Sequence, residues 1–185
     1  MKHFSKRLRL AAVGLGAALL VMACGGVRKA TVPMATSLEK SSCPRGNVDT
    51  LLVMLPGAYS TPDEFEREGF IRAVHENRIA ADVMLVDSHL GYFNDKSVLD
   101  RLSADVMVPA RSQGYRHIWF VSISLGGFGA MLYAQTHPGE LAGLVTLAPY
   151  LGERALSADI ANAGGLASWG GPLVDPGGRP PRTPD

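Results

Sequence analysis

The fold is decided by Trp119-Phe120-Val121-Ser122-Ile123-Ser124-Leu125-Gly126-Gly127-Phe128-Gly129, residues 119–129 of the chain. The apolar first half predicts a buried strand over 117–123, and the second half opens a helix expected over 125–136. Ser124 stands at the junction, with small residues two positions before and two positions after it. A tight strand-to-helix turn requires small residues there, because the helix begins directly against the strand. The stretch therefore predicts a strand–turn–helix unit that lifts Ser124 clear of a sheet.

Strand and helix patterns alternate on both sides of this unit. Short apolar runs predict buried strands over 50–55, 82–86 and 144–148. Helices are predicted from about 61 to 77 and over 97–113. Such alternation implies parallel strands joined by right-handed crossovers. The predicted fold class is therefore α/β, a doubly wound, mostly parallel sheet of about four strands with three main helices.

The residues before the predicted core, which spans 48–150, indicate export. A basic start and an apolar run from Leu10 to Ala23 predict a signal peptide over 1–23. The sequence Val21-Met22-Ala23-Cys24-Gly25 resembles the lipobox of bacterial lipoproteins, which implies that Cys24 is lipidated and becomes the mature N-terminus. An ordinary secretory signal or an uncleaved anchor is the alternative. The expected location is the cell envelope, with the chain held at a membrane through its lipid anchor.

Two further segments lack sustained periodicity. Residues 24–47 are predicted to be a tether, and residues 151–185 an irregular tail with one short helix near 157–162. We interpret this tail as a truncated cap or connection. If Cys24 carries lipid, Cys43 has no internal partner; a Cys24–Cys43 disulfide is the alternative.

The composition argues against nucleic-acid binding. The chain has 185 residues and a net charge of +1, and much of its basic excess lies in the leader. The other lysines and arginines are interspersed with acids and form no basic stripe. The histidines are dispersed without ligand spacing, so no metal and no cofactor is predicted.

The stretch around Ser124 resembles the nucleophile elbow of the α/β-hydrolase family, which usually reads Gly-x-Ser-x-Gly; here Ser122 replaces the first glycine. The resemblance covers about residues 48–150. It implies a partial α/β-hydrolase fold with Ser124 as nucleophile and the backbone N–H of Leu125 as an oxyanion donor. A phosphate-binding turn is the alternative, but no Gly-x-x-x-x-Gly-Lys or Gly-x-Gly-x-x-Gly motif surrounds it.

The second oxyanion donor is expected from the loop Leu55–Tyr59, with the N–H of Ala58 first and that of Tyr59 second. An ordinary Pro-Gly turn is the alternative for this loop. The loop after the second strand begins with Asp87-Ser88-His89 and leaves the same edge of the sheet. Asp87 and His89 are therefore candidates for substrate contact, and His89 also for an unorthodox base.

A serine nucleophile needs a histidine base and a carboxylate that orients it. In the family both follow the serine along the chain. The last histidine here is His137, at the far end of the helix that starts at Leu125 and roughly 18 Å away. Asp175 fits the order best among the later acids, but its Gly/Pro-rich surroundings argue against it. Because neither partner is identifiable, we interpret the chain as truncated relative to a complete hydrolase, with a divergent complete protein as the alternative.

The resemblance implies a serine hydrolase that cleaves carboxylic esters or related acyl groups through a Ser124 acyl-enzyme. Its substrate would be a small-molecule or lipid ester. Because no base is identifiable, an inactive fragment of such a hydrolase is the alternative to an active enzyme. The alternative function is that of a non-catalytic lipoprotein that uses the hydrolase scaffold for binding.

Overall fold

The computed structural model describes residues 27–41 and 48–171. Five strands form one sheet in the order β1-β3-β2-β4-β5. The strands are β1 (Thr36–Glu39), β2 (Thr50–Leu55), β3 (Asp82–Val86), β4 (His117–Ile123) and β5 (Gly143–Leu147). β2, β3, β4 and β5 are parallel, and β1 pairs antiparallel with β3 at one edge. The predicted fold class, a mostly parallel α/β sheet, is confirmed.

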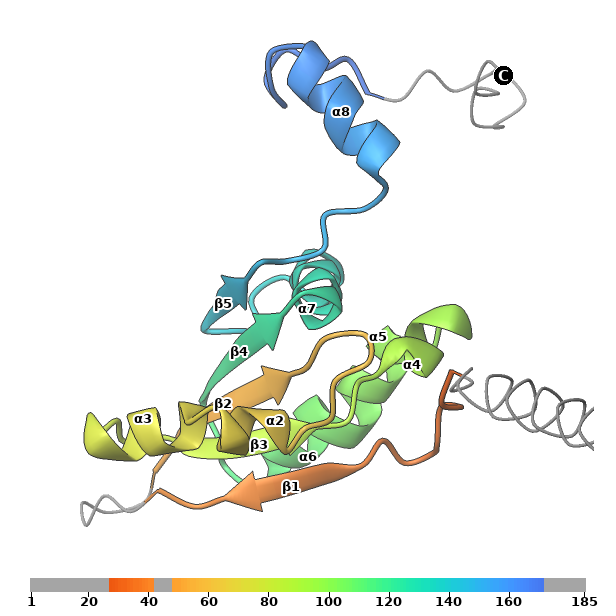
Figure 1. Cartoon of the computed structure of the whole chain (residues 1–185). Coiled ribbons are helices and arrows are strands. Elements are labelled where there is room, and N and C mark those ends of the chain that lie inside the picture. Colours follow the sequence, from red (N-terminus) through yellow and green to blue (C-terminus); the bar gives the residue numbers. More distant parts are fainter. Residues whose placement is uncertain (1–26, 42–47, 172–185) are drawn as a thin grey trace, which may run out of the picture.

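Helices cover both faces of the sheet (Figure 1). On one face lie α2 (Glu64–Arg67) and α3 (Phe70–Glu76), between β2 and β3. The other face carries α4 (Leu90–Asn94), α5 (Val98–Arg101), the π-helical segment η1 (Leu102–Met107), α6 (Val108–Ser112) and α7 (Leu125–Thr136). The last helix, α8 (Arg154–Asn162), stands apart from the sheet, and none of its residues is buried.

Two predicted helices are interrupted. The helix expected over 61–77 is divided into α2 and α3 at Gly69, whose φ of 83° is left-handed and therefore suited to glycine. The helix expected over 97–113 contains the π-helical turns of η1 directly before α6. Pro109 lies in the first turn of α6 and has no N–H to donate to the helix, which accounts for a local change of hydrogen-bond pattern.

Part of the predicted tether belongs to the sheet. β1 lies inside residues 24–47, and Met34 just before it is buried in the core. The N–H of Met34 donates to the Asp105 carboxylate at 2.8 Å, and the N–H of Asp87 donates to the Ala35 carbonyl at 3.0 Å. A four-residue edge strand with mostly exposed side chains has little hydrophobic pattern, so the sequence gives no sign of it.

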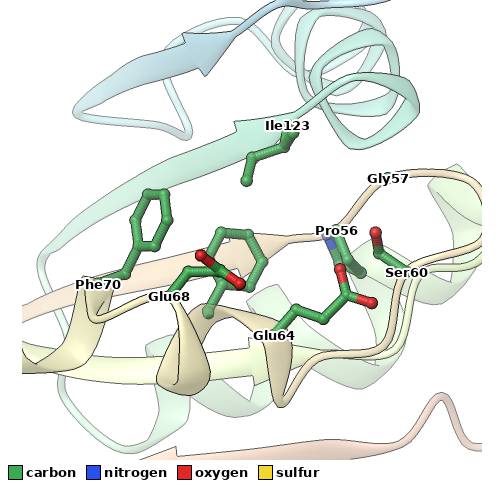
Figure 2. A pocket seen from close by; sticks show the side chains of 8 residues that line it. Pro56, Gly57, Ser60, Glu64, Glu68, Phe70 and Ile123 are labelled. Atoms are coloured by element: carbon green, nitrogen blue, oxygen red, sulfur yellow. The ribbon is translucent and has the colours of Figure 1, made fainter.

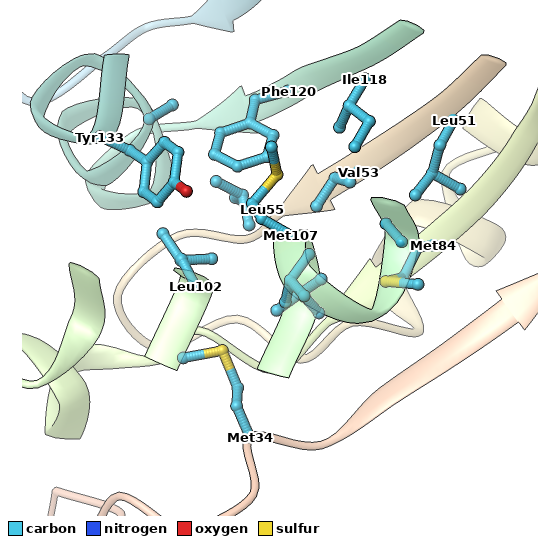
Figure 3. Close-up of a cluster of buried hydrophobic side chains, with 14 of the residues drawn as sticks. Met34, Leu51, Val53, Leu55, Met84, Leu102, Met107, Ile118, Phe120 and Tyr133 are labelled. Atoms are coloured by element: carbon cyan, nitrogen blue, oxygen red, sulfur yellow. The ribbon is translucent and has the colours of Figure 1, made fainter. Parts of the chain in front are cut away.

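Two hydrophobic clusters lie on opposite faces of the sheet. The smaller one joins α2 and α3 to β3 and β2, and Figure 2 shows Phe70 and Ile123 pointing toward it from the helix side and from β4. The larger one joins β2, β4 and β3 to the helices α4 to α7; Figure 3 shows Phe120 and Tyr133 side by side within it, with ring centroids 5.4 Å apart. Helix packing on both faces makes the central strands β2 and β3 the most buried part of the fold.

A polar network fastens β1 at the end of the sheet where β3 begins. The buried Asp82 carboxylate accepts hydrogen bonds from the Ser41 N–H at 2.7 Å, the Tyr115 hydroxyl at 2.5 Å and the Lys40 ammonium at 2.9 Å. Burial by itself raises the pKa of Asp82, but these three donors outweigh it and hold the pKa below its ordinary value of 3.8. The charged carboxylate therefore stabilises the fold.

We expect Asp82→Asn to lower the free energy of unfolding by about 1–3 kcal/mol at neutral pH, because the donors lose their charged acceptor. Since the folded-state pKa of Asp82 lies below 3.8, its contribution is full above that pH and is lost as the pH falls through the lower folded value. Urea unfolding of the wild type at neutral and acidic pH measures this loss, which the variant should lack. Glu39→Gln, on the exposed side of β1, is the matched control; an equal effect of both variants would contradict the prediction.

Candidate active site

Ser124 has a strained backbone at the turn where the sequence predicts a nucleophile elbow. It lies between β4 and α7 with φ 52° and ψ −115°, a conformation that a residue with a side chain rarely adopts and that costs about 1–3 kcal/mol. Four backbone hydrogen bonds hold it there: its N–H donates to Leu147 at 3.1 Å, and its carbonyl accepts from Gly127 at 3.0 Å, Phe128 at 3.3 Å and Tyr150 at 2.9 Å. The turn is therefore held by the first residues of α7, by Leu147 at the end of β5 and by Tyr150 just after it.

The glycines after Ser124 allow a close backbone approach. A Cβ on Gly126 would lie 2.6 Å from the Pro56 carbonyl oxygen and closer still to that of Leu55, so no side chain fits there. A Cβ on Gly127 would lie 2.8 Å from the Cβ of Pro149. The first turn of α7 consequently packs directly on the loop after β2 and on the turn after β5.

Ser122 occupies the position where the family pattern has its first glycine. Its side chain is buried, and its Oγ donates to the Val145 carbonyl oxygen at 3.3 Å. The hydroxyl thus has an acceptor on β5, next to the parallel pairing of β4 with β5. Gly127 lies close to this serine, since a Cβ on Gly127 would be 3.7 Å from the Ser122 Oγ.

The loop after β2 lies beside the elbow, as predicted. A Cβ on Gly57 would lie 3.7 Å from the Cβ of Ser124. The Ala58 carbonyl accepts from the Leu90 N–H at 3.1 Å, which ties the loop to the start of α4. Within the described part of the chain, the N–H groups of Leu125, Ala58 and Tyr59 donate to no backbone carbonyl outside the regular elements. The role of these N–H groups as donors to an oxyanion stays a prediction.

His89 lies at the predicted edge of the sheet but has a structural task there. It is buried, and its Nδ1 accepts a hydrogen bond from the Gly91 N–H at 3.1 Å as the N-cap of α4. In a neutral ring whose Nδ1 is an acceptor, Nε2 carries the proton and cannot also take one from a serine. Burial, assisted by the positive charge of Arg28, lowers the pKa of His89. This geometry argues against His89 as a general base.

Asp87, the other candidate of this loop, forms an ion pair. Its Oδ2 lies 2.9 Å from Arg28 Nη1, while its Oδ1 is buried without a hydrogen-bond partner among the described residues. Arg28 also donates to the Ser60 carbonyl at 3.1 Å and so connects the end of β3 to the loop after β2. Sequence reasoning missed Arg28, because a single arginine in a polar segment carries no pattern.

A small pocket of about 50 Å³ adjoins the loop after β2, and Pro56, Gly57 and Ser60 of that loop line it. Phe65, Phe70 and Ile123 give it an apolar floor, and Figure 2 shows the carboxylates of Glu64 and Glu68 at its rim. Gly57 lines the pocket and also lies against Ser124, so the pocket is next to the elbow.

The other histidines of the described residues are far from catalytic positions. His117 begins β4 at the opposite end of the strand from Ser124, His137 stacks on Tyr133 at the end of α7, and His75 lies in α3. No hydrogen bond found within 27–41 and 48–171 joins a histidine to the Ser124 hydroxyl.

Asp175 and Cys24 lie outside the described residues. Those residues contain no group of three or more metal-ligating side chains. No helix among them has the length and apolar character to cross a membrane.

Comparisons with known proteins find relatives only among solved structures. No family model and no curated protein matches the sequence. The matching structures include monoacylglycerol lipase of Paleococcus ferrophilus (14% identity, TM-score 0.43, 72% of this chain and 51% of that one). They also include proline iminopeptidase of Mycobacterium smegmatis (16%, 0.49, 69% and 44%) and the peroxisomal alpha-beta-hydrolase Lpx1 of Saccharomyces cerevisiae (14%, 0.44, 67% and 47%).

The chain spans about half the length of these structures. The identities are 16% or lower and the TM-scores are below 0.5, so this likeness assigns neither a family nor an activity to the chain. The described residues form a mostly parallel α/β sheet with hydrophobic clusters on both of its faces.

Gly126→Ala should destabilise the protein strongly, because the new methyl group would overlap the Leu55 and Pro56 carbonyl oxygens. Overpacking and displacement of α7 are expected to cost about 3 kcal/mol or more. Urea unfolding measures the effect. Gly170→Ala is the control, since nothing lies within 4 Å of its added Cβ. Equal stability of the two variants would show that the close contact at Gly126 is dispensable.

His89→Ala should cost about 1 kcal/mol through loss of the α4 cap, and His89→Asn should restore most of it, because asparagine is a good N-cap. Thermal unfolding of both variants measures the difference. Since the folded state lowers the pKa of His89 below 6.5, the histidine's contribution is present above that pH and is lost as the pH falls through the lower folded value. Wild type should show this loss of stability in acid more than His89→Asn does. Full stability of His89→Ala would rule out the capping role.

Proposed function

We propose that this protein is a serine hydrolase that cleaves carboxylic esters or related acyl compounds through an acyl-enzyme on Ser124. The observation that carries the proposal is the left-handed backbone of Ser124 between β4 and α7. A serine held at such a cost, where glycine would be unstrained, indicates that the hydroxyl itself is needed at this turn.

In this reaction the Ser124 Oγ attacks the carbonyl carbon of the ester, and its proton passes to a base. The carbonyl oxygen becomes negatively charged and is stabilised by the N–H of Leu125 and by that of Ala58 or Tyr59. Collapse expels the alcohol, which takes the proton, and water then hydrolyses the acyl group from Ser124. No hydrogen bond among the described residues joins a histidine to Ser124, so the base and its carboxylate partner are unassigned.

We further propose that the protein is exported and anchored to a membrane of the cell envelope through lipid on Cys24. The basic leader, the apolar run and the lipobox-like sequence support this. Several acyl chains on one cysteine would give durable attachment, whereas a single chain binds membranes reversibly.

A second function, non-catalytic binding on a hydrolase scaffold, is favoured by one observation. His89, the histidine at the elbow's edge of the sheet, is occupied as a helix cap. Without a base, Ser124 would be an ordinary alcohol of low reactivity.

A fluorophosphonate probe separates the two functions, because it reacts with an activated serine. We expect the full-length protein to be labelled at Ser124, as located by peptide mass spectrometry, and Ser124→Ala to lose all labelling. The matched control is Ser112→Ala, at the exposed end of α6, which should label like the wild type. A folded wild-type protein that is never labelled would contradict the hydrolase and favour the binding function.

A further inference from the structure

The segment before β1 is held at the end of the sheet where the parallel strands finish, which is also the end that carries Ser124. β1 is antiparallel to β3, and Thr36 pairs with Val86, the last residue of β3. Residues before Thr36 therefore lie where the parallel strands end, and Figure 1 shows the chain leaving β1 toward the side to which β2 points. Arg28 binds Asp87 and Ser60 there, and the N–H of Thr31 donates to the Tyr92 hydroxyl at 3.2 Å.

This attachment limits how far the lipid anchor can be from the active site. Cys24 precedes Arg28 by four residues. Even fully extended, four residues span at most about 14 Å. Arg28 in turn holds the loop that contacts Ser124. A lipid on Cys24 would thus keep this end of the sheet next to the bilayer, since the chain between them is too short to let the domain turn over.

The same end of the sheet is rimmed by exposed apolar side chains. Tyr59 after β2 is 82% exposed, Val32 before β1 77%, and Leu151 after β5 65%. Val27 and Tyr150 are also exposed there. They come from three segments, before β1, after β2 and after β5, which the strand pairing brings to the same end of the sheet. Apolar and aromatic side chains around a site are suited to the lipid–water interface.

The opposite end of the sheet is charged. Asp49 before β2 forms an exposed ion pair with Arg116 before β4, at 2.6 Å, and Lys40 lies over Asp82 at the start of β3. Ile79, three residues before β3, is 46% exposed. The elbow end also carries an ion pair, Arg28–Asp87, so the apolar rim and the short link to Cys24 are what favour one orientation at a membrane.

We propose that the active-site end of the sheet faces the membrane and that its apolar rim contacts the lipid–water interface. The inference rests on the proposed hydrolase function and on lipidation of Cys24. The substrate class that follows is an ester presented at the membrane surface, such as a lipid ester, because such a group reaches Ser124 without first entering bulk water. The rim would lie at the headgroup level, with Tyr59 and Leu151 in contact with acyl chains.

The orientation can be measured with an environment-sensitive fluorophore on single cysteines. The full-length lipidated protein, in a Cys43→Ser background, is bound to vesicles of phosphatidylcholine and phosphatidylglycerol that contain brominated acyl chains. Leu151→Cys reports the active-site end, and Ile79→Cys is the matched control at the charged end. Both positions are exposed, so labelling should leave the fold intact. Flotation of the vesicles first establishes that the protein is anchored.

We expect a label at position 151 to shift to the blue and to be quenched at least about threefold more than a label at position 79, because only the former reaches the acyl chains. Equal quenching, or stronger quenching at position 79, would overturn the orientation, and protein that fails to float would overturn the anchor on which it depends. Fluorophosphonate labelling of the same samples tests the hydrolase separately. A correct orientation without labelling would therefore refute the activity and leave the membrane-facing edge in place.

Discussion

The contact between the first turn of α7 and the loop after β2 governs the rest of the structure. Gly126 lies against two carbonyl oxygens of that loop, and any side chain there would force the helix away. The helix in turn sets the strained turn at Ser124, because two of its first N–H groups bond to the Ser124 carbonyl. The turn after β5 completes the arrangement through Tyr150 and Pro149. Close packing of these backbones therefore offsets the local cost of the elbow.

The parts of the fold that the sequence predicts are those with a strong local pattern. β2, β3 and β4 are apolar runs with clear ends, and the spacing of small residues around Ser124 has one physical explanation, a tight turn. β1 could not be predicted, since its pairing with β3 depends on the backbone and its side chains are mostly exposed. The π-helical turns of η1 lie just before Pro109 and carry the buried Leu102, Val106 and Met107; helical periodicity over 97–113 does not encode this change of hydrogen-bond pattern.

The candidate site shows the same division. The elbow and the neighbouring loop lie together as expected, because consecutive parallel strands end at the same edge. The tasks of individual polar residues were harder to predict. His89 and Asp87 were identified by their position after β3, but their partners, the Gly91 N–H and Arg28, are set by three-dimensional contacts. Arg28 lies 59 positions from Asp87 along the chain, so only the folded structure shows that the N-terminal segment supports the loops after β3 and β2.

The exposed position of β5 has a consequence for how the protein behaves in solution. In the described part of the chain this strand is hydrogen-bonded on one side only, and its five residues carry no charge. Val145 and Leu147 are exposed on its surface. Unpaired backbone groups beside apolar side chains are a template for edge-to-edge association, which natural proteins commonly prevent with lysine, proline or a bulge. Wherever this edge is uncovered it favours self-association, and a lysine introduced at the centre of β5 would be the simplest way to oppose it.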